Sequence, residues 1–238
     1  MVRVVLPLPV LPGKTAADAK AIGDEFMRRP DEWAESRRRQ GVTLERAYLQ
    51  TTPMGMFVVA YIEGEKSFTE VNALVAASDL DIDKFFVNAI RELHGVDVSQ
   101  AAAGPQPETI GVWTDSEVSE RRRGLAFSAP GLPGTEAKGR AFIADAFGRP
   151  GMAESRRAIG NNLEVVSVIT TPAGPVVGVY VEGRDPEEAN RSFAASTSEF
   201  DTWFKDQLRA IHPPFIDFNQ PVQGIEEIFD SEAILARR

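Results

Sequence analysis

Residues 34–38 read Ala-Glu-Ser-Arg-Arg, and the same five residues recur at 153–157. Further matches follow in the same order at nearly the same offset: Leu11-Pro12-Gly13 with Leu132-Pro133-Gly134, Thr51-Thr52-Pro53 with Thr170-Thr171-Pro172, Tyr61 with Tyr180, and Ala77-Ser78 with Ala195-Ser196. A constant offset of similarity along a chain indicates that one structural unit is repeated. The sequence therefore predicts two tandem domains, residues 1–119 and 122–238, joined by a short charged run that ends in Gly124.

Each copy is predicted to fold in the order strand, helix, strand, strand, helix. Apolar runs bounded by Gly or Pro predict strands at 2–10, 44–51 and 55–63 in the first copy and at 124–129, 163–170 and 175–182 in the second. The first helix contains Pro30 in one copy and Pro150 in the other. An internal proline costs about 3 kcal/mol in a helix, so we expect a break or a kink at each.

Composition restricts the classes of function. Lys and Arg number 26 against 35 Asp and Glu, and the net charge of −9 disfavours nucleic acid as a partner. The absence of cysteine excludes disulfides and thiolate sites, and with only two histidines we expect neither a metal site nor a bound cofactor. No apolar run approaches the roughly 20 residues that cross a bilayer. We therefore expect no membrane contact and a cytoplasmic location.

An acidic stretch precedes the last helix of the first copy. Asp79, Asp81 and Asp83 alternate as at the start of a calcium-binding EF-hand loop, but Lys84 stands where that loop requires glycine. Helix capping is the expected role of these carboxylates.

Helices on one face of an antiparallel sheet leave the other face to be covered, and two copies can cover each other. This arrangement resembles the ferredoxin-like βαββα units of the dimeric α+β-barrel superfamily, here fused into an internal pseudo-dimeric α+β barrel. The repeated Ala-Glu-Ser-Arg-Arg helix, the Thr-Thr-Pro hairpin and a last helix ending in Arg-x-x-His resemble a group of bacterial proteins without an assigned function. The superfamily includes cofactor-free monooxygenases, lactone isomerases, stress-response proteins and haem enzymes, so the resemblance implies a fold and leaves the reaction open.

The two histidines are the first candidates for catalysis because they occupy equivalent places, in Arg91-Glu92-Leu93-His94 and Arg209-Ala210-Ile211-His212. Helical spacing from preceding apolar residues predicts that each ring is half-buried at a helix C-terminus. The helix dipole there raises an imidazole pKa and burial lowers it, so either ring could serve as a general acid or base. The alternative is a histidine that only bonds the terminal carbonyls.

Six further residues are candidates for ligand contact. An arginine binds carboxylates or enolates, although the repeated Glu-Ser-Arg-Arg also suits a solvated helix face with ion pairs. A tyrosine hydroxyl orients a carbonyl or phenolate, although a tyrosine bonded to backbone is the simpler alternative. A tryptophan in an apolar helix stripe serves in core packing more often than in a ligand site. The candidates are Tyr48, Tyr61, Tyr180, Arg37, Arg156 and Trp203.

Two hypotheses about function remain open, and so does whether the chain is an enzyme. The first is a small-molecule-binding protein that takes an apolar or aromatic ligand and performs cofactor-independent acid–base, oxygenase or isomerase chemistry, with His94 or His212 as the base. The second is a non-catalytic interaction or stress-response protein. Haem binding of the chlorite dismutase kind is less favoured, because no proximal histidine motif can be matched. Open sheet edges also predict a homo-oligomer.

Overall fold

The computed structural model describes residues 1–236, except the side chains of residues 101 and 102, and divides them into two compact units. Unit 1 is Met1–Pro107 together with the C-terminal segment that starts at Gly224, and unit 2 is Glu108–Gln223. Within the described residues, each unit combines helices with one four-stranded antiparallel sheet. This mixed architecture confirms the predicted α+β fold class.

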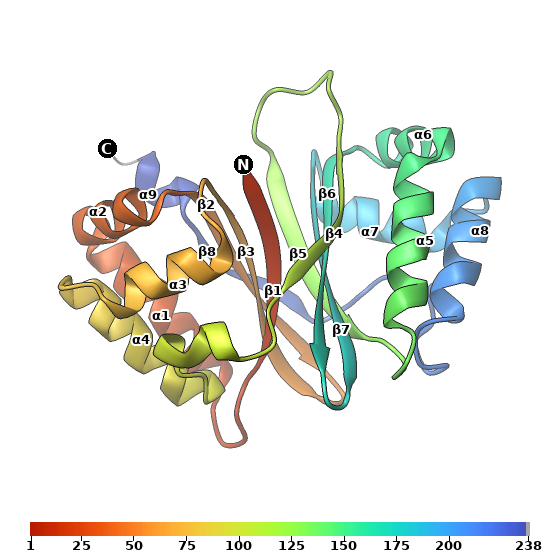
Figure 1. Ribbon diagram of the computed structural model, residues 1–238. Helices are drawn as coiled ribbons and strands as arrows, with labels where there is room; N and C mark the ends of the chain where they lie inside the picture. The colour runs from red at the N-terminus through yellow and green to blue at the C-terminus, as the bar shows by residue number, and fades with distance from the viewer. Residues whose placement is uncertain (237–238) are drawn as a thin grey trace. The chain divides into compact units, whose positions relative to one another are not determined.

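Unit 1 contains the first and the last elements of the chain: β1 (Val2–Pro9), α1 (Ala16–Arg28), α2 (Pro30–Gln40), β2 (Val42–Thr52), β3 (Gly55–Gly64), α3 (Phe68–Ala76), α4 (Asp81–His94), the 3-10 helix η1 (Val98–Ala103), β8 (Ile225–Asp230) and α9 (Glu232–Leu235). Its strand order is β1-β3-β2-β8. Helices α1 to α4 cover one face of this sheet (Figure 1).

Unit 2 contains the central elements: β4 (Glu108–Thr114), β5 (Arg123–Pro130), α5 (Glu136–Gly148), α6 (Pro150–Ala158), β6 (Asn161–Thr171), β7 (Gly174–Gly183), α7 (Pro186–Ala195) and α8 (Glu199–Arg209). Its strand order is β4-β6-β7-β5. Helices α5 to α8 lie on one side of this second sheet (Figure 1).

One edge strand of each sheet, β8 in unit 1 and β4 in unit 2, comes from the other sequence copy. β4 follows the first copy's helices but pairs with β6, where Val112 lies opposite Val165. β8 follows the second copy's helices but pairs with β2, where Phe229 lies opposite Ala47. The compact units therefore exchange the arms 108–114 and 225–230 relative to the copies 1–119 and 122–238.

The predicted hairpins and proline breaks are confirmed, and each copy also contains a further strand, β4 or β8, that the predicted order lacked. The β2–β3 and β6–β7 hairpins form, and Thr52 pairs with Gly55 across the first turn. Helix α1 ends at Arg28 and α2 begins at Pro30, and the second copy repeats this break at Pro150. Proline is tolerated in the first turn of a helix because that position needs no intrahelical N–H bond. The break therefore separates two helices rather than bending one.

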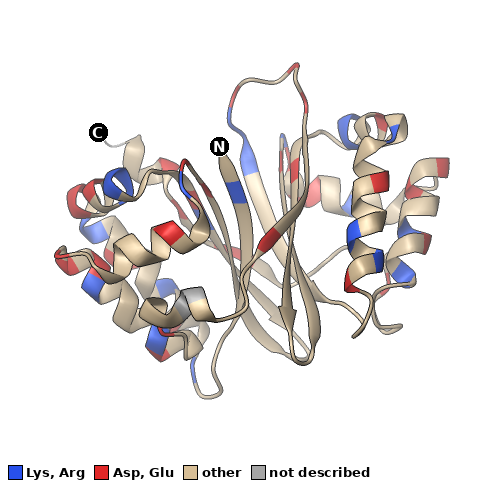
Figure 2. Ribbon diagram, viewed as in Figure 1, with Lys and Arg blue, Asp and Glu red and all other residues tan. Residues whose placement is uncertain are grey.

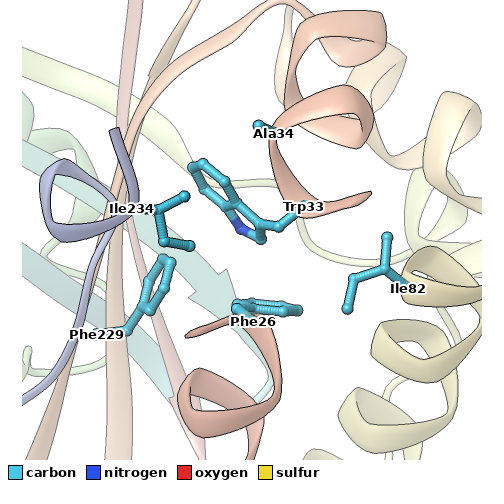
Figure 3. Packing of buried hydrophobic residues seen from close by; sticks show 6 residues of the cluster. All are labelled: Phe26, Trp33, Ala34, Ile82, Phe229 and Ile234. Atoms are coloured by element: carbon cyan, nitrogen blue, oxygen red, sulfur yellow. The ribbon is translucent and has the colours of Figure 1, made fainter. Parts of the chain in front are cut away.

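Large apolar side chains form the cores between helices and sheets. In unit 1, Phe26 packs against Phe229 with ring centroids 5.3 Å apart, and Trp33 lies 5.7 Å from the same ring (Figure 3). In unit 2, Phe142 and Phe204 lie 4.9 Å apart in the corresponding core. Phe86 of α4 and Trp203 of α8 pack against these same cores.

Candidate functional site

The two histidine rings are held by the same contact in both units. His94 is the last residue of α4, and its Nδ1 lies 2.8 Å from the carbonyl oxygen of Pro9 at the end of β1. His212 follows α8, and its Nδ1 lies 2.7 Å from the carbonyl oxygen of Pro130 at the end of β5. A carbonyl oxygen only accepts hydrogen bonds, so Nδ1 carries the proton in each ring. In the neutral ring, Nε2 is therefore left with a free lone pair.

Both rings are more buried than the predicted half-buried position, with 6% of His94 and 4% of His212 exposed. Burial lowers the pKa of both imidazoles below the ordinary value, and the hydrogen bond to the proline carbonyl opposes this only in part. Desolvation is thus the effect that sets the direction of the pKa shift in both rings. Both rings are therefore neutral near pH 7.

The surroundings of the two imidazoles differ. The Nε2 atom of His94 is buried and has no hydrogen-bond partner among the described residues. The His212 ring instead lies edge-on to Phe218, with the ring centroids 5.4 Å apart. A buried nitrogen lone pair without a donor is costly unless something else donates to it. His94 is accordingly the stronger candidate for contact with a ligand.

The first arginine of each repeated Glu-Ser-Arg-Arg, Arg37 or Arg156, lies inside its unit, away from the solvated surface. Arg37 donates from Nε to Glu45 at 2.6 Å, and its guanidinium lies 5.4 Å from the Trp33 ring centroid. Arg156 makes the corresponding contact with Glu164 at 2.5 Å. The solvated face that the sequence also suggested is formed by the neighbours of Arg37 on α2, including Arg38. The helices carry a mixture of positive and negative side chains (Figure 2).

A serine–aspartate pair, which sequence reasoning missed, adjoins each buried arginine. Ser36 donates to Asp83 at 2.6 Å in unit 1, and Ser155 donates to Asp201 at 2.6 Å in unit 2. The signal available in the sequence was that both members of the pair recur at equivalent positions. The expectation that Asp83 caps α4 is wrong, because the N-cap is Leu80 without a side-chain bond and Asp83 lies in the core.

The three tyrosines lie on the face of each sheet that points away from the helices. Side chains alternate along a strand, and Val58 of β3 packs with Leu93 on the helix side, so Tyr61 points to the opposite face. Tyr48 shares that face because it lies opposite Val59. The same alternation holds for Tyr180 in β7, since Val179 packs in the helix-side core. The sheets therefore separate the tyrosines from the histidines.

The tyrosines of β3 and β7 each bond a buried glutamate two residues further on. Tyr61 donates to Glu63 at 2.5 Å, and Tyr180 donates to Glu182 at 3.1 Å. Both carboxylates are almost fully buried. The repeated Tyr-x-Glu was visible in the sequence, and its period of two already implied a shared face. Neither tyrosine follows the expected alternative of a bond to backbone in these contacts.

Trp203 lies at the margin of the unit 2 core. Its ring contacts Phe142 and Phe200, with centroids 5.8 and 5.6 Å away. The guanidinium of Arg149 stacks on it at 3.9 Å. A stacked arginine over an indole is a cation–π contact. The contacts of Trp203 are thus those of packing.

Two kinds of feature are absent from the described residues. No group of three or more His, Asp or Glu side chains within residues 1–236 is arranged to hold a metal ion. No helix in the same part of the chain is long and apolar enough to cross a membrane.

Comparison with known proteins establishes the fold. No family model and no curated protein matches the chain. An "anthrone oxidase-like protein" of known structure is 13% identical with a TM-score of 0.52, and the match covers 95% of this chain and 93% of that chain. At this identity the similarity extends to architecture and not to reaction.

Two more solved structures have the same architecture, and each is called a "putative monooxygenase". The one from Fusobacterium nucleatum subsp. nucleatum is 9% identical with a TM-score of 0.50, covering 94% of this chain and 88% of that chain. The one from Lactobacillus acidophilus is 10% identical with a TM-score of 0.50, covering 97% and 95%. The chain thus shares its fold over nearly its whole length with proteins of this kind.

Proposed function

We propose that the protein binds a small apolar or aromatic molecule beside His94 and removes a proton from it, as the first step of a cofactor-independent oxygenation or isomerisation. The observation that carries this proposal is the Nε2 atom of His94, which is buried, has a free lone pair and has no donor among the described residues. The bond to Pro9 prevents the ring from turning and keeps the proton on Nδ1.

The chemistry follows from the state of the ring. A neutral imidazole near pH 7 accepts a proton from a weakly acidic C–H or O–H group when water is excluded. The residues around Leu93, which precedes His94, are apolar and include Ala19 and Leu49. Such surroundings favour a ligand with little charge before the proton moves.

The names of the structural neighbours suggest a probe. Anthrone has an acidic methylene group, and removal of a proton from this group gives an anion that reacts with O₂. The overall reaction, anthrone plus O₂ to anthraquinone plus water, needs no other oxidant. An isomerisation would instead return the proton from the imidazolium to another carbon of the same molecule.

The test compares His94→Gln with the matched variant His212→Gln in the full-length protein. Anthrone is added under air, O₂ consumption is measured against the rate without protein, and ¹⁵N NMR follows the imidazole nitrogens. We expect the wild type and His212→Gln to accelerate consumption and anthrone to shift the His94 Nε2 signal. Equal rates in His94→Gln and wild type, with no shift of that signal by anthrone, would contradict the proposal.

A second candidate function is supported by the repetition of the contact. His212 makes the same bond to Pro130 as His94 makes to Pro9, and both bonds tie the end of the first strand to the end of the last helix. On this account both imidazoles are structural and the protein is a non-catalytic interaction protein. Loss of stability in both variants without any effect of anthrone would favour it.

A homo-oligomeric state and a cytoplasmic location stay predictions.

A further inference from the structure

The two sheets have the same arrangement of strands, but their equivalent edge strands, β8 and β4, come from different places in the order of the chain. In unit 2 all four strands lie within the continuous segment Glu108–Gln223, and the outer strand β4 comes first. In unit 1 the outer strand β8 comes last, after unit 2 has been completed. Unit 2 therefore has the connectivity of a circular permutant of unit 1.

We infer that the C-terminal segment 224–235 is a latch that closes unit 1 and whose release opens unit 1 alone. This inference concerns the opening of the fold and does not depend on the proposed function. It follows from the connectivity, because the latch supplies a strand to the sheet of unit 1, whereas the unit 2 sheet takes none of its strands from this segment.

Polar contacts hold the latch along the edge of β2. Arg46, in the middle of β2, donates to Asp230 at 2.9 Å and also pairs with Glu232. Ser231 and Glu45 exchange two bonds of 3.0 Å, one from each backbone N–H. At the other end, the N–H of Thr51 donates to the carbonyl of Gly224 at 2.8 Å. The contacts thus extend over the whole length of β8.

Apolar side chains of the latch complete the helix-side core of unit 1. Phe229 and Ile234 are buried with Phe26 and Trp33, as Figure 3 shows. Ile228 packs in the cluster that contains Leu93, the residue before His94. Release of the latch would therefore expose the cores under both α1 and α4.

Helix α1 lies directly against the latch. A methyl group added at Gly23 would come within 2.6 Å of the carbonyl oxygen of Ile228. Such an approach is possible only for glycine. Release of the latch would therefore remove the surface against which Gly23 of α1 packs.

The carboxylates of the latch provide a way to weaken it. Asp230 and Glu232 are 21% and 41% exposed, whereas Arg46 is 1% exposed. Replacing the two carboxylates with amides keeps their size and takes both negative charges away from the buried Arg46. In unit 2, Asp115 anchors the end of β4 by pairing with Arg157 at 2.8 Å. Asp115→Asn is therefore the matched control.

The experiment is hydrogen–deuterium exchange with mass spectrometry on the full-length double variant Asp230→Asn/Glu232→Gln, on Asp115→Asn and on wild type. We expect the double variant to exchange at least tenfold faster in β2, β8 and α1, with β6 and β7 within twofold of wild type. Asp115→Asn should accelerate β4 and leave β2 and β8 unchanged.

Two outcomes of this experiment would overturn the latch. One is unchanged exchange in β2 and β8 of the double variant, and the other is equal acceleration of both units. If the double variant does not fold, Ser231→Ala removes one bond to the backbone of Glu45 and is judged by the same pattern. Because the readout requires no ligand, failure of the His94 proposal would leave this result unaffected.

Discussion

The Nδ1 atom of His94 lies 2.8 Å from the carbonyl oxygen of Pro9, and so the last residue of α4 is joined to the last residue of β1. The same bond joins His212 to Pro130. Because the bond requires only the neutral ring, it fixes the tautomer without a charged partner. Both the chemistry of Nε2 and the response of the fold to acid follow from this arrangement.

Stability is expected to fall in mild acid because of the two histidines. Burial lowers the pKa of both rings in the folded state, so the unfolded chain binds protons more readily. Their full contribution is therefore present above the ordinary pKa of about 6.5 and is lost as the pH falls toward the folded value. Denaturant unfolding between pH 5 and 8 measures this slope. His94→Gln and His212→Gln should each reduce it, and a slope unchanged in both variants would refute this origin.

Arg37→Ala should destabilise the protein strongly, and Arg156→Ala should do the same. Each change leaves a buried carboxylate, Glu45 or Glu164, without its counter-ion, which costs about 3–5 kcal/mol. Arg38, next in sequence and 71% exposed, is the control. Arg38→Ala should cost less than about 0.5 kcal/mol. Denaturant unfolding compares the variants, and equal losses for Arg37 and Arg38 would show that the buried pair has no special weight.

Gly23→Ala should destabilise although alanine favours helices. Its methyl group would meet the carbonyl oxygen of Ile228 at 2.6 Å, and overpacking of this kind costs about 1–3 kcal/mol. Gly148, the last residue of α5, has nothing within 4 Å of the same added atom. Gly148→Ala should therefore be neutral or gain about 0.4–1 kcal/mol. Thermal unfolding of both variants provides the measurement, and a stabilising Gly23→Ala would contradict the close approach.

Glu35 should titrate far below an ordinary glutamate. Hydrogen bonds from Arg38 and Arg39 lower the pKa of its carboxyl from 4.5 to about 2. The stabilisation by this pairing is present above pH 4.5 and is lost as the pH falls through the folded value. Carbon-13 NMR titration of the carboxyl group measures it directly. Arg39→Ala should move the pKa upward, as should high salt, since the group is at the surface.

Much of the local structure could be predicted because it depends on neighbours in the chain. Pro30 lacks an N–H and clashes with the preceding turn, so a break or a kink was expected there whatever packs against the helix. The turn at Thr52 and Gly55 likewise joins two apolar strands at hairpin distance. The repeat then carried each of these assignments from one copy to the other.

The candidate site could be predicted only in part. The equivalence of His94 and His212 was visible, but the bond to a proline carbonyl 85 or 82 residues away was not. Arg37 and Arg38 are adjacent and chemically identical, and one is buried while the other is solvated. A helix turns 100° per residue, so the position of the sheet decided which of them faces the core.

The sequence by itself determined the repeat, the three strands and the helices of each copy as far as the last helix, the helix breaks and the acidic charge, because these follow from composition and from contacts between near neighbours. Only the tertiary structure decided that β8 pairs with β2 and β4 with β6, and that the sheets part the tyrosines from the histidines. The two arms have similar sequences, Val112-Trp113-Thr114-Asp115-Ser116-Glu117 and Ile228-Phe229-Asp230-Ser231-Glu232, so their local patterns do not indicate which sheet edge each one pairs with. The choice between those edges depends on the path of the whole chain, which no local pattern records.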